Sequence, residues 1–271
     1  MFRLASRLLA FSAVATSAAL LTACPASVNG KVDEEAVDAL LSAFFIEDQQ
    51  DYGEDDTQYT VTGVGTSVLG ACEAGTKAQA NTNTLLETMY EDIQDADGDA
   101  DAIADAQKAY AEGVVDYEVK NFPTDYWRVN ASVKALDDGL FEGLEQDIDL
   151  EDVDDSTLDP TDDEDAVANL SICRVNDHPK VDESDDVYTV ERDEDCFVAK
   201  KGTLTVSKYE SEKAFTVTAE VELTALDGDG TIKDIDDDAG EVVVNINAGH
   251  CPTLEEEIQN MSDIIEDAMD G

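Results

Sequence analysis

The chain has few basic residues and is strongly acidic. Its 271 residues include 16 Lys plus Arg against 65 Asp plus Glu, a formal net charge of −49. No basic patch can neutralise phosphates, so nucleic acid is excluded as a direct partner. Self-repulsion of this size destabilises a compact state. The repulsion weakens as the Debye length falls from about 8 Å at physiological ionic strength to about 3 Å at 1 M salt. The composition therefore predicts a protein that works in saline surroundings and attracts cations.

Histidine is scarce as well, and common catalytic motifs are missing. The two histidines, His178 and His250, have no metal-ligand spacing such as HExxH. Ser67 lies in a glycine-containing stretch, residues 63–70, that fits neither GxSxG nor a phosphate-binding loop and is expected in a strand or bulge. Carboxylates are so numerous that a catalytic pair could arise by chance. We therefore expect no enzyme activity, with a carboxylate-based hydrolase as the alternative.

Long apolar runs are absent after the N-terminus. The single run, residues 8–21, follows Arg3 and Arg7 and ends in small residues. It is shorter than the roughly 20 residues that a transmembrane helix needs. Positive charge, a short apolar run and small residues are the three parts of an export signal. Residues 1–23 are therefore predicted to be a signal peptide.

The string Leu21-Thr22-Ala23-Cys24 resembles the lipobox of bacterial lipoproteins. The resemblance implies that the Cys24 thiol is diacylated, that the preceding peptide is removed, and that the new amino terminus is usually acylated. Two or three acyl chains hold a protein stably on a bilayer. Pro25 follows where an Asp would resemble an inner-membrane retention signal, so the outer membrane is favoured. We expect a lipid-anchored protein of the cell envelope, and an ordinary cleaved signal with a chance cysteine is the alternative.

Four cysteines remain once Cys24 is set aside. They are Cys72, Cys173, Cys196 and Cys251. An even number in an exported chain predicts two disulfides, and three connectivities are possible. We favour Cys196 with Cys251, which brackets a run of strands, and Cys72 with Cys173, which would tie the helical part to it. No pair has the CxxC spacing that would favour a metal-thiolate site.

Periodicity predicts an α+β fold in consecutive regions. A tether (24–31) precedes a mainly helical region (32–118), in which apolar residues at helical spacing predict helices near 32–45, 85–93 and 103–117 around a strand-like segment at 59–69. Residues 119–251 are β-rich, because alternation of period two at 127–133, 203–207, 215–225 and 242–247 predicts an antiparallel sheet or small sandwich. An exposed acidic loop (142–165) interrupts this region. Residues 252–271 are expected to form a C-terminal helix that starts with a capping box at Thr253 and Glu256.

Two aspartate-glycine loops are candidate calcium sites, because alternate oxygen ligands around a glycine suit Ca²⁺. The first joins two expected helices, and the second resembles the middle of an EF-hand loop but has Ala225 in place of the first ligand. A hairpin turn is the alternative for the second loop. The candidate ligands are Asp95, Asp97, Asp99 and Asp101 in the first loop, and Asp227 and Asp229 in the second.

The sequence thus predicts a lipid-anchored protein of a salt-adapted bacterium with a structural or binding role, and an envelope protein or a surface ligand is the expected partner. The alternatives are an envelope hydrolase and a calcium-stabilised adhesin.

Overall fold

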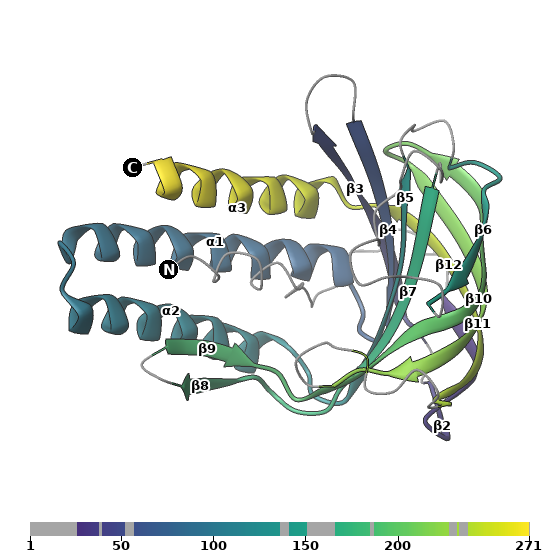
Figure 1. Ribbon diagram of the computed structural model, residues 1–271, viewed down its shortest axis with the longest axis horizontal. Helices are drawn as coiled ribbons and strands as arrows, with labels where there is room; N and C mark the ends of the chain where they lie inside the picture. Colours follow the sequence, from purple (N-terminus) through teal and green to yellow (C-terminus); the bar gives the residue numbers. More distant parts are fainter. Residues whose placement is uncertain are drawn as a thin grey trace.

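The computed structural model describes residues 26–37, 40–51, 57–135, 141–150, 166–184, 187–227, 232 and 238–270. The fold is α+β: a large, strongly curved sheet carries three long helices at one end (Figure 1). Among the described residues, no helix is both long enough and apolar enough to cross a membrane.

Seven strands form a sheet that closes on itself. Each strand pairs with the next in the order β3, β4, β5, β7, β10, β11, β12, and β12 returns to β3. All these pairings are antiparallel except the last, a short parallel contact of Gly249 and His250 with Phe44 and Phe45. Closure removes most exposed strand edges, which would otherwise be templates for aggregation. The strands are Ser42–Asp51 (β3), Thr57–Thr66 (β4), Tyr126–Ala135 (β5), Ala166–Val175 (β7), Glu194–Glu210 (β10), Ala214–Ala225 (β11) and Gly240–His250 (β12).

Short strands occupy the edge positions that the closed sheet leaves open. β1 (Ser27–Val32) pairs with β12 beyond its contact with β3, and β2 (Glu35–Ala36) folds back on β1. β6 (Glu145–Asp149) pairs with the later part of β10, next to the part that β7 occupies. β8 (Lys180–Ser184) and β9 (Val187–Glu191) form a separate hairpin beside α2.

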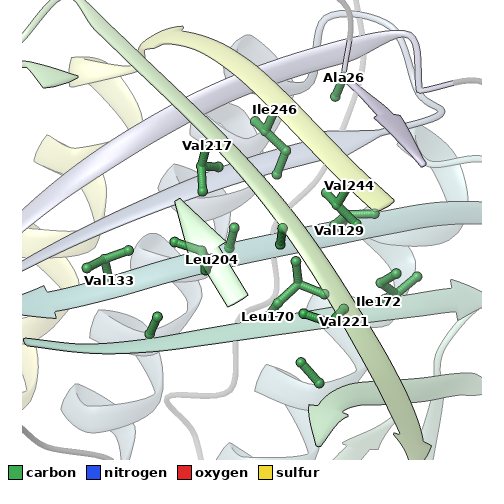
Figure 2. Packing of buried hydrophobic residues seen from close by; sticks show 14 of the residues in the cluster. Ala26, Val129, Val133, Leu170, Ile172, Leu204, Val217, Val221, Val244 and Ile246 are labelled. Carbon is green, nitrogen blue, oxygen red and sulfur yellow. The ribbon is translucent and has the colours of Figure 1, made fainter. Parts of the chain in front are cut away.

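The interior of the closed sheet is filled by alternate side chains of its strands (Figure 2). Leu170, Leu204 and Ile246 are fully buried there, among neighbours from every strand of the ring. Gly63 on β4 makes room for the ring of Phe215, because a Cβ at this position would lie 2.9 Å from that ring. In the glycine-containing stretch around Ser67, the expected strand is present and ends at Thr66, and a turn follows it.

Three helices lie side by side and project from one end of the sheet: α1 (Ala71–Asp95), α2 (Ala100–Asn121) and α3 (Pro252–Asp270) (Figure 1). α1 contacts both α2 and α3. At their base, a second apolar cluster joins Phe44 and Val64 of the sheet to Ala71 of α1 and Leu254 of α3. The helices are thus fixed to the outside of β3 and β4, while the interior cluster lies on the other side of these strands.

The predicted helix at residues 32–45 is wrong, because the described residues of this segment include the end of β1, all of β2 and the start of β3. Phe45 lies inside the closed sheet and Phe44 lies under the helices, so both faces of β3 are buried. A strand buried on both faces shows a continuous apolar run, which periodicity cannot distinguish from a helix. The expected tether is also shorter than predicted, since Ala26 is already buried and Ser27 begins β1.

Part of the expected acidic loop forms a strand, β6. This strand pairs with β10 and buries the side chain of Ile148. Residues 151–165 lie outside the described residues. The strands expected near 59–69 and between 127 and 247, the two expected helices that α1 and α2 contain, and the C-terminal helix are all confirmed. That last helix begins at Pro252, where proline's fixed φ suits the first turn, so Thr253 lies inside the helix and not at its cap.

Candidate functional site

Two disulfides form, but with a connectivity that differs from the one we favoured. Cys72 pairs with Cys251, and Cys173 pairs with Cys196. Cys173 and Cys196 lie directly opposite each other on the neighbouring strands β7 and β10. Cys251 follows β12 and lies beside the first turn of α1, which contains Cys72. The spacing of cysteines along the chain carries no information about which strands become neighbours, and this is why the prediction failed.

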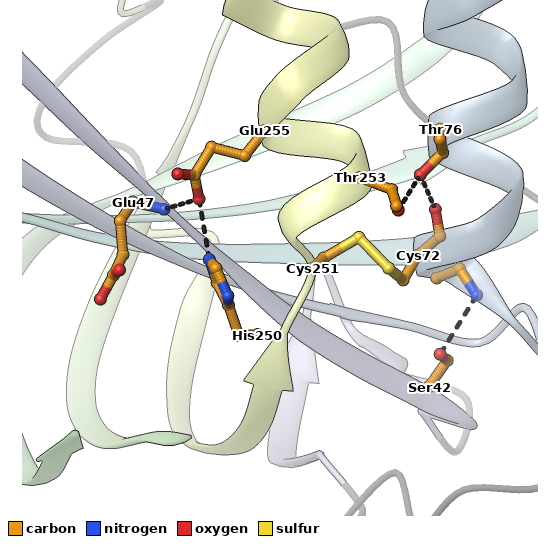
Figure 3. Close-up of a disulfide and its surroundings, with 9 residues drawn as sticks. Ser42, Glu47, Cys72, Thr76, His250, Cys251, Thr253 and Glu255 are labelled. Carbon is orange, nitrogen blue, oxygen red and sulfur yellow. Dashed lines mark hydrogen bonds and ion pairs between the residues drawn. A yellow bond between two sulfur atoms is a disulfide. The ribbon is translucent and has the colours of Figure 1, made fainter. Parts of the chain in front are cut away.

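A cluster of polar groups surrounds the Cys72–Cys251 disulfide at the point where α3 leaves the sheet (Figure 3). His250 is the last residue of β12. Its Nε2 lies 2.8 Å from Glu255 Oε2, and its side chain is only 9% exposed. Its ring is tilted against that of Phe45, with the ring centroids 5.1 Å apart. The backbone N–H of Glu47 donates to the same Glu255 oxygen at 3.1 Å. Glu255 thus connects α3 to β12 and β3.

The Glu47 carboxylate makes a second set of contacts. Its Oε2 accepts hydrogen bonds from the Ser211 hydroxyl at 3.1 Å and from the Glu212 backbone N–H at 3.3 Å. Its Oε1 is buried without a hydrogen-bond partner among the described residues. These bonds fix the turn between β10 and β11 to β3.

A histidine, two carboxylates and a serine are the groups that a hydrolase would need, but their bonds do not make a catalytic relay. In a nucleophile–base pair, the serine hydroxyl is hydrogen-bonded to the histidine. Here the Ser211 hydroxyl is bonded to Glu47, and the histidine nitrogen is bonded to Glu255. These hydrogen bonds instead hold α3, β3 and the β10–β11 turn together.

A second polar cluster lies where α2 meets β5 and the start of β10. Arg128 forms an ion pair with Glu194 at 3.2 Å, with side chains 10% and 21% exposed, and Arg192 forms one with Glu118 of α2. Burial raises the pKa of the phenol of Tyr126 above its usual value. Burial raises the pKa of Tyr110, on the neighbouring helix, in the same way. Both phenols therefore stay protonated at neutral pH. The ion pair of Arg192 with Glu118 joins α2 to the segment that precedes β10.

The structure does not bring the four candidate calcium ligands of the first loop together. Asp95 ends α1, and the turn that follows has positive φ at Asp97 and Gly98. The side chain of Asp99 accepts hydrogen bonds from the N–H groups of Asp101 and Ala102, which makes it the N-cap of α2. These carboxylates thus lie in an ordinary turn between two helices.

Within the described part of the chain, a single group brings three ligand-type atoms together: Cys173, Glu194 and Cys196, whose two sulfur atoms are already joined in a disulfide. Of the second loop, Asp227 is exposed and Asp229 lies outside the described residues. Cys24 also lies outside them.

The chain matches no family model, no curated protein and no solved structure. The pairing of His250 with Glu255 was missed by sequence reasoning. The sequence signal for this pair is that the two residues are five positions apart, across the end of a strand and the start of a helix. In so acidic a chain, many residues have a carboxylate five positions away by chance.

Proposed function

We propose that this chain is a lipid-anchored envelope protein of a salt-adapted bacterium, with a structural or binding role. The observation that carries the proposal is the pairing of the cysteines. The four cysteines other than Cys24 bond to one another in two disulfides, which suits export to an oxidising compartment. Cys24 is thereby the cysteine left for a lipid.

The packing inside the closed sheet supports a structural or binding role. Its interior is filled by apolar side chains, as in small closed sheets that hold no ligand. Binding would therefore use the outer surface of the sheet or the helices. The polar cluster at His250 joins elements of the fold, which agrees with a role outside catalysis.

The proposal is tested with the variant Cys24→Ser, expressed in a Gram-negative host and followed by fractionation. We expect the wild type in the membrane fraction and Cys24→Ser in the soluble fraction. The double variant Cys173→Ser/Cys196→Ser is the matched control, because it also loses cysteines and should stay with the membrane. A Cys24→Ser protein that still partitions with membranes would refute the anchor.

A further inference from the structure

The chain enters the sheet close to the proposed anchor. Ala26 is buried beside Leu40 and Gly65: a Cβ built on Gly65 would lie 2.9 Å from the Ala26 Cβ and 3.0 Å from Leu40 Cδ1. Figure 2 shows Ala26 next to the strands of the closed sheet. Ser27 lies three positions after Cys24, so even a fully extended chain spans at most about 11 Å between them. A lipid on Cys24 would hold the wall of the sheet near the bilayer.

Among the described residues, the outward side chains of the sheet nearest Ser27 are uncharged. On β12, Val242, Val244 and Ile246 point into the core, so the alternate residues point outward. Register places Ser27 of β1 and Thr218 of β11 on either side of Asn245. We name this surface the uncharged face; it consists of Ser27, Asn29, Thr216, Thr218, Val243, Asn245 and Asn247. Charged residues border this face: Glu220, Glu241 and Lys31 lie at one end, and Lys208 lies opposite Thr216 at the other.

The uncharged face contrasts with the charge of the whole molecule. Removal of the signal takes away Arg3 and Arg7, so 14 basic residues face 65 acidic ones and the net charge becomes −51. Carboxylates within a Debye length of anionic lipid headgroups are repelled, while neutral hydroxyl and amide groups are not. The face next to the anchor has no carboxylate of its own and can therefore approach an anionic bilayer with less of this repulsion.

A second side of the sheet also carries uncharged residues, so the lack of charge alone does not identify the side that faces the membrane. On the outside of β4, β5 and β7, Thr62 bonds to Ser132, and Asn169 lies opposite Ser132. These residues are also uncharged, but β7 is separated from β12 by β10 and β11 on one side and by β5, β4 and β3 on the other. The position of Cys24 in the chain therefore decides between the two walls.

We propose that the uncharged face on β1, β11 and β12 rests against the headgroups of the bilayer in which Cys24 is anchored. The proposal rests on the lipid anchor proposed above. It fixes the orientation of the protein: the wall formed by β5 and β7 points away from the membrane.

The test compares one thiol on each wall of the lipidated protein. Asn245→Cys and Asn169→Cys each replace an exposed strand asparagine, and the four native cysteines are protected in disulfides. A fluorescent dye on each thiol is measured in vesicles of phosphatidylcholine and phosphatidylglycerol that contain a headgroup-linked nitroxide quencher. We expect the quencher to remove more than half of the emission at position 245 and to leave the emission at position 169 nearly unchanged.

Equal quenching at the two positions, or stronger quenching at position 169, would overturn the proposed orientation. Failure of the lipidated protein to bind vesicles at all would instead overturn the anchor itself, so the two failures are distinguishable. Circular dichroism checks the fold of each variant. The pair Thr218→Cys and Ser132→Cys, on the same two walls, repeats the comparison if either asparagine variant does not fold.

Discussion

At the scale of single residues, His250 is central to the attachment of α3. Its ring contacts Phe45 inside the sheet, and its Nε2 bonds to Glu255 at the start of the helix. The variant His250→Gln loses the ring contact and leaves the Glu255 carboxylate with a poorer partner. We expect the free energy of unfolding to fall by about 1–2 kcal/mol, measured by urea denaturation.

The other histidine provides the control for this variant. His178 lies in the connection between β7 and β8, where its backbone N–H, and not its ring, bonds to Asp177. His178→Gln should therefore leave the stability unchanged. Equal losses in the two variants would contradict a specific role for His250.

Burial of Tyr126 predicts a loss of stability at alkaline pH. Its folded-state pKa is raised above the usual value of about 10, so the folded protein holds this proton more tightly than the unfolded chain does. Stability is unaffected below the unfolded pKa and falls as the pH rises from about 10 toward the folded pKa. Tyr126→Phe removes the titrating group and should flatten this decline, measured by denaturant unfolding at several alkaline pH values. An unchanged slope would show that Tyr126 is not responsible.

At the scale of elements, the strands with one buried face could be predicted from the sequence and the doubly buried ones could not. From Ala214 to Leu223, β11 alternates between buried and outward residues, so its period is visible. β3 is covered by the interior on one side and by the helices on the other, and it was mistaken for a helix. The disulfide partners and the contact of His250 with Glu255 depend on which elements become neighbours. Local pattern does not contain that information.

The two disulfides should differ in their contribution to stability. Cys72–Cys251 closes a loop of 179 residues and Cys173–Cys196 one of 23 residues. On the chain-entropy model, removal of the first should cost about 5 kcal/mol and removal of the second about 3.5 kcal/mol. Thermal unfolding of the two double Cys→Ser variants tests this order. A larger loss for the Cys173 and Cys196 variant would contradict it.

At the scale of the whole molecule, the dominant feature is its charge. Unlike-charged groups are paired at several places, such as Lys77 with Glu73 and Lys213 with Glu210, but 65 acidic residues far exceed the 16 basic ones. Most of the acidic groups thus repel one another in the folded state, and salt weakens this repulsion by screening the charges.

This repulsion predicts that salt stabilises the fold. We expect NaCl between physiological and molar concentration to raise Tm by several degrees or more, since each kcal/mol shifts Tm by about 2–4 °C for a domain of this size. Sucrose of equal osmolality is the control, because it does not screen charge. Near-ultraviolet circular dichroism and a Tm that are both unchanged from low salt to molar NaCl would count against salt adaptation.

The mass of the mature N-terminal peptide tests the central claim, that Cys24 carries the lipid that attaches this protein to a membrane. The protein is purified from membranes with detergent, digested, and analysed by mass spectrometry. We predict a peptide that begins at Cys24 and carries a diacylglyceryl group on its sulfur. A mature chain that retains residues before Cys24, or a Cys24 without acyl groups, would contradict the account.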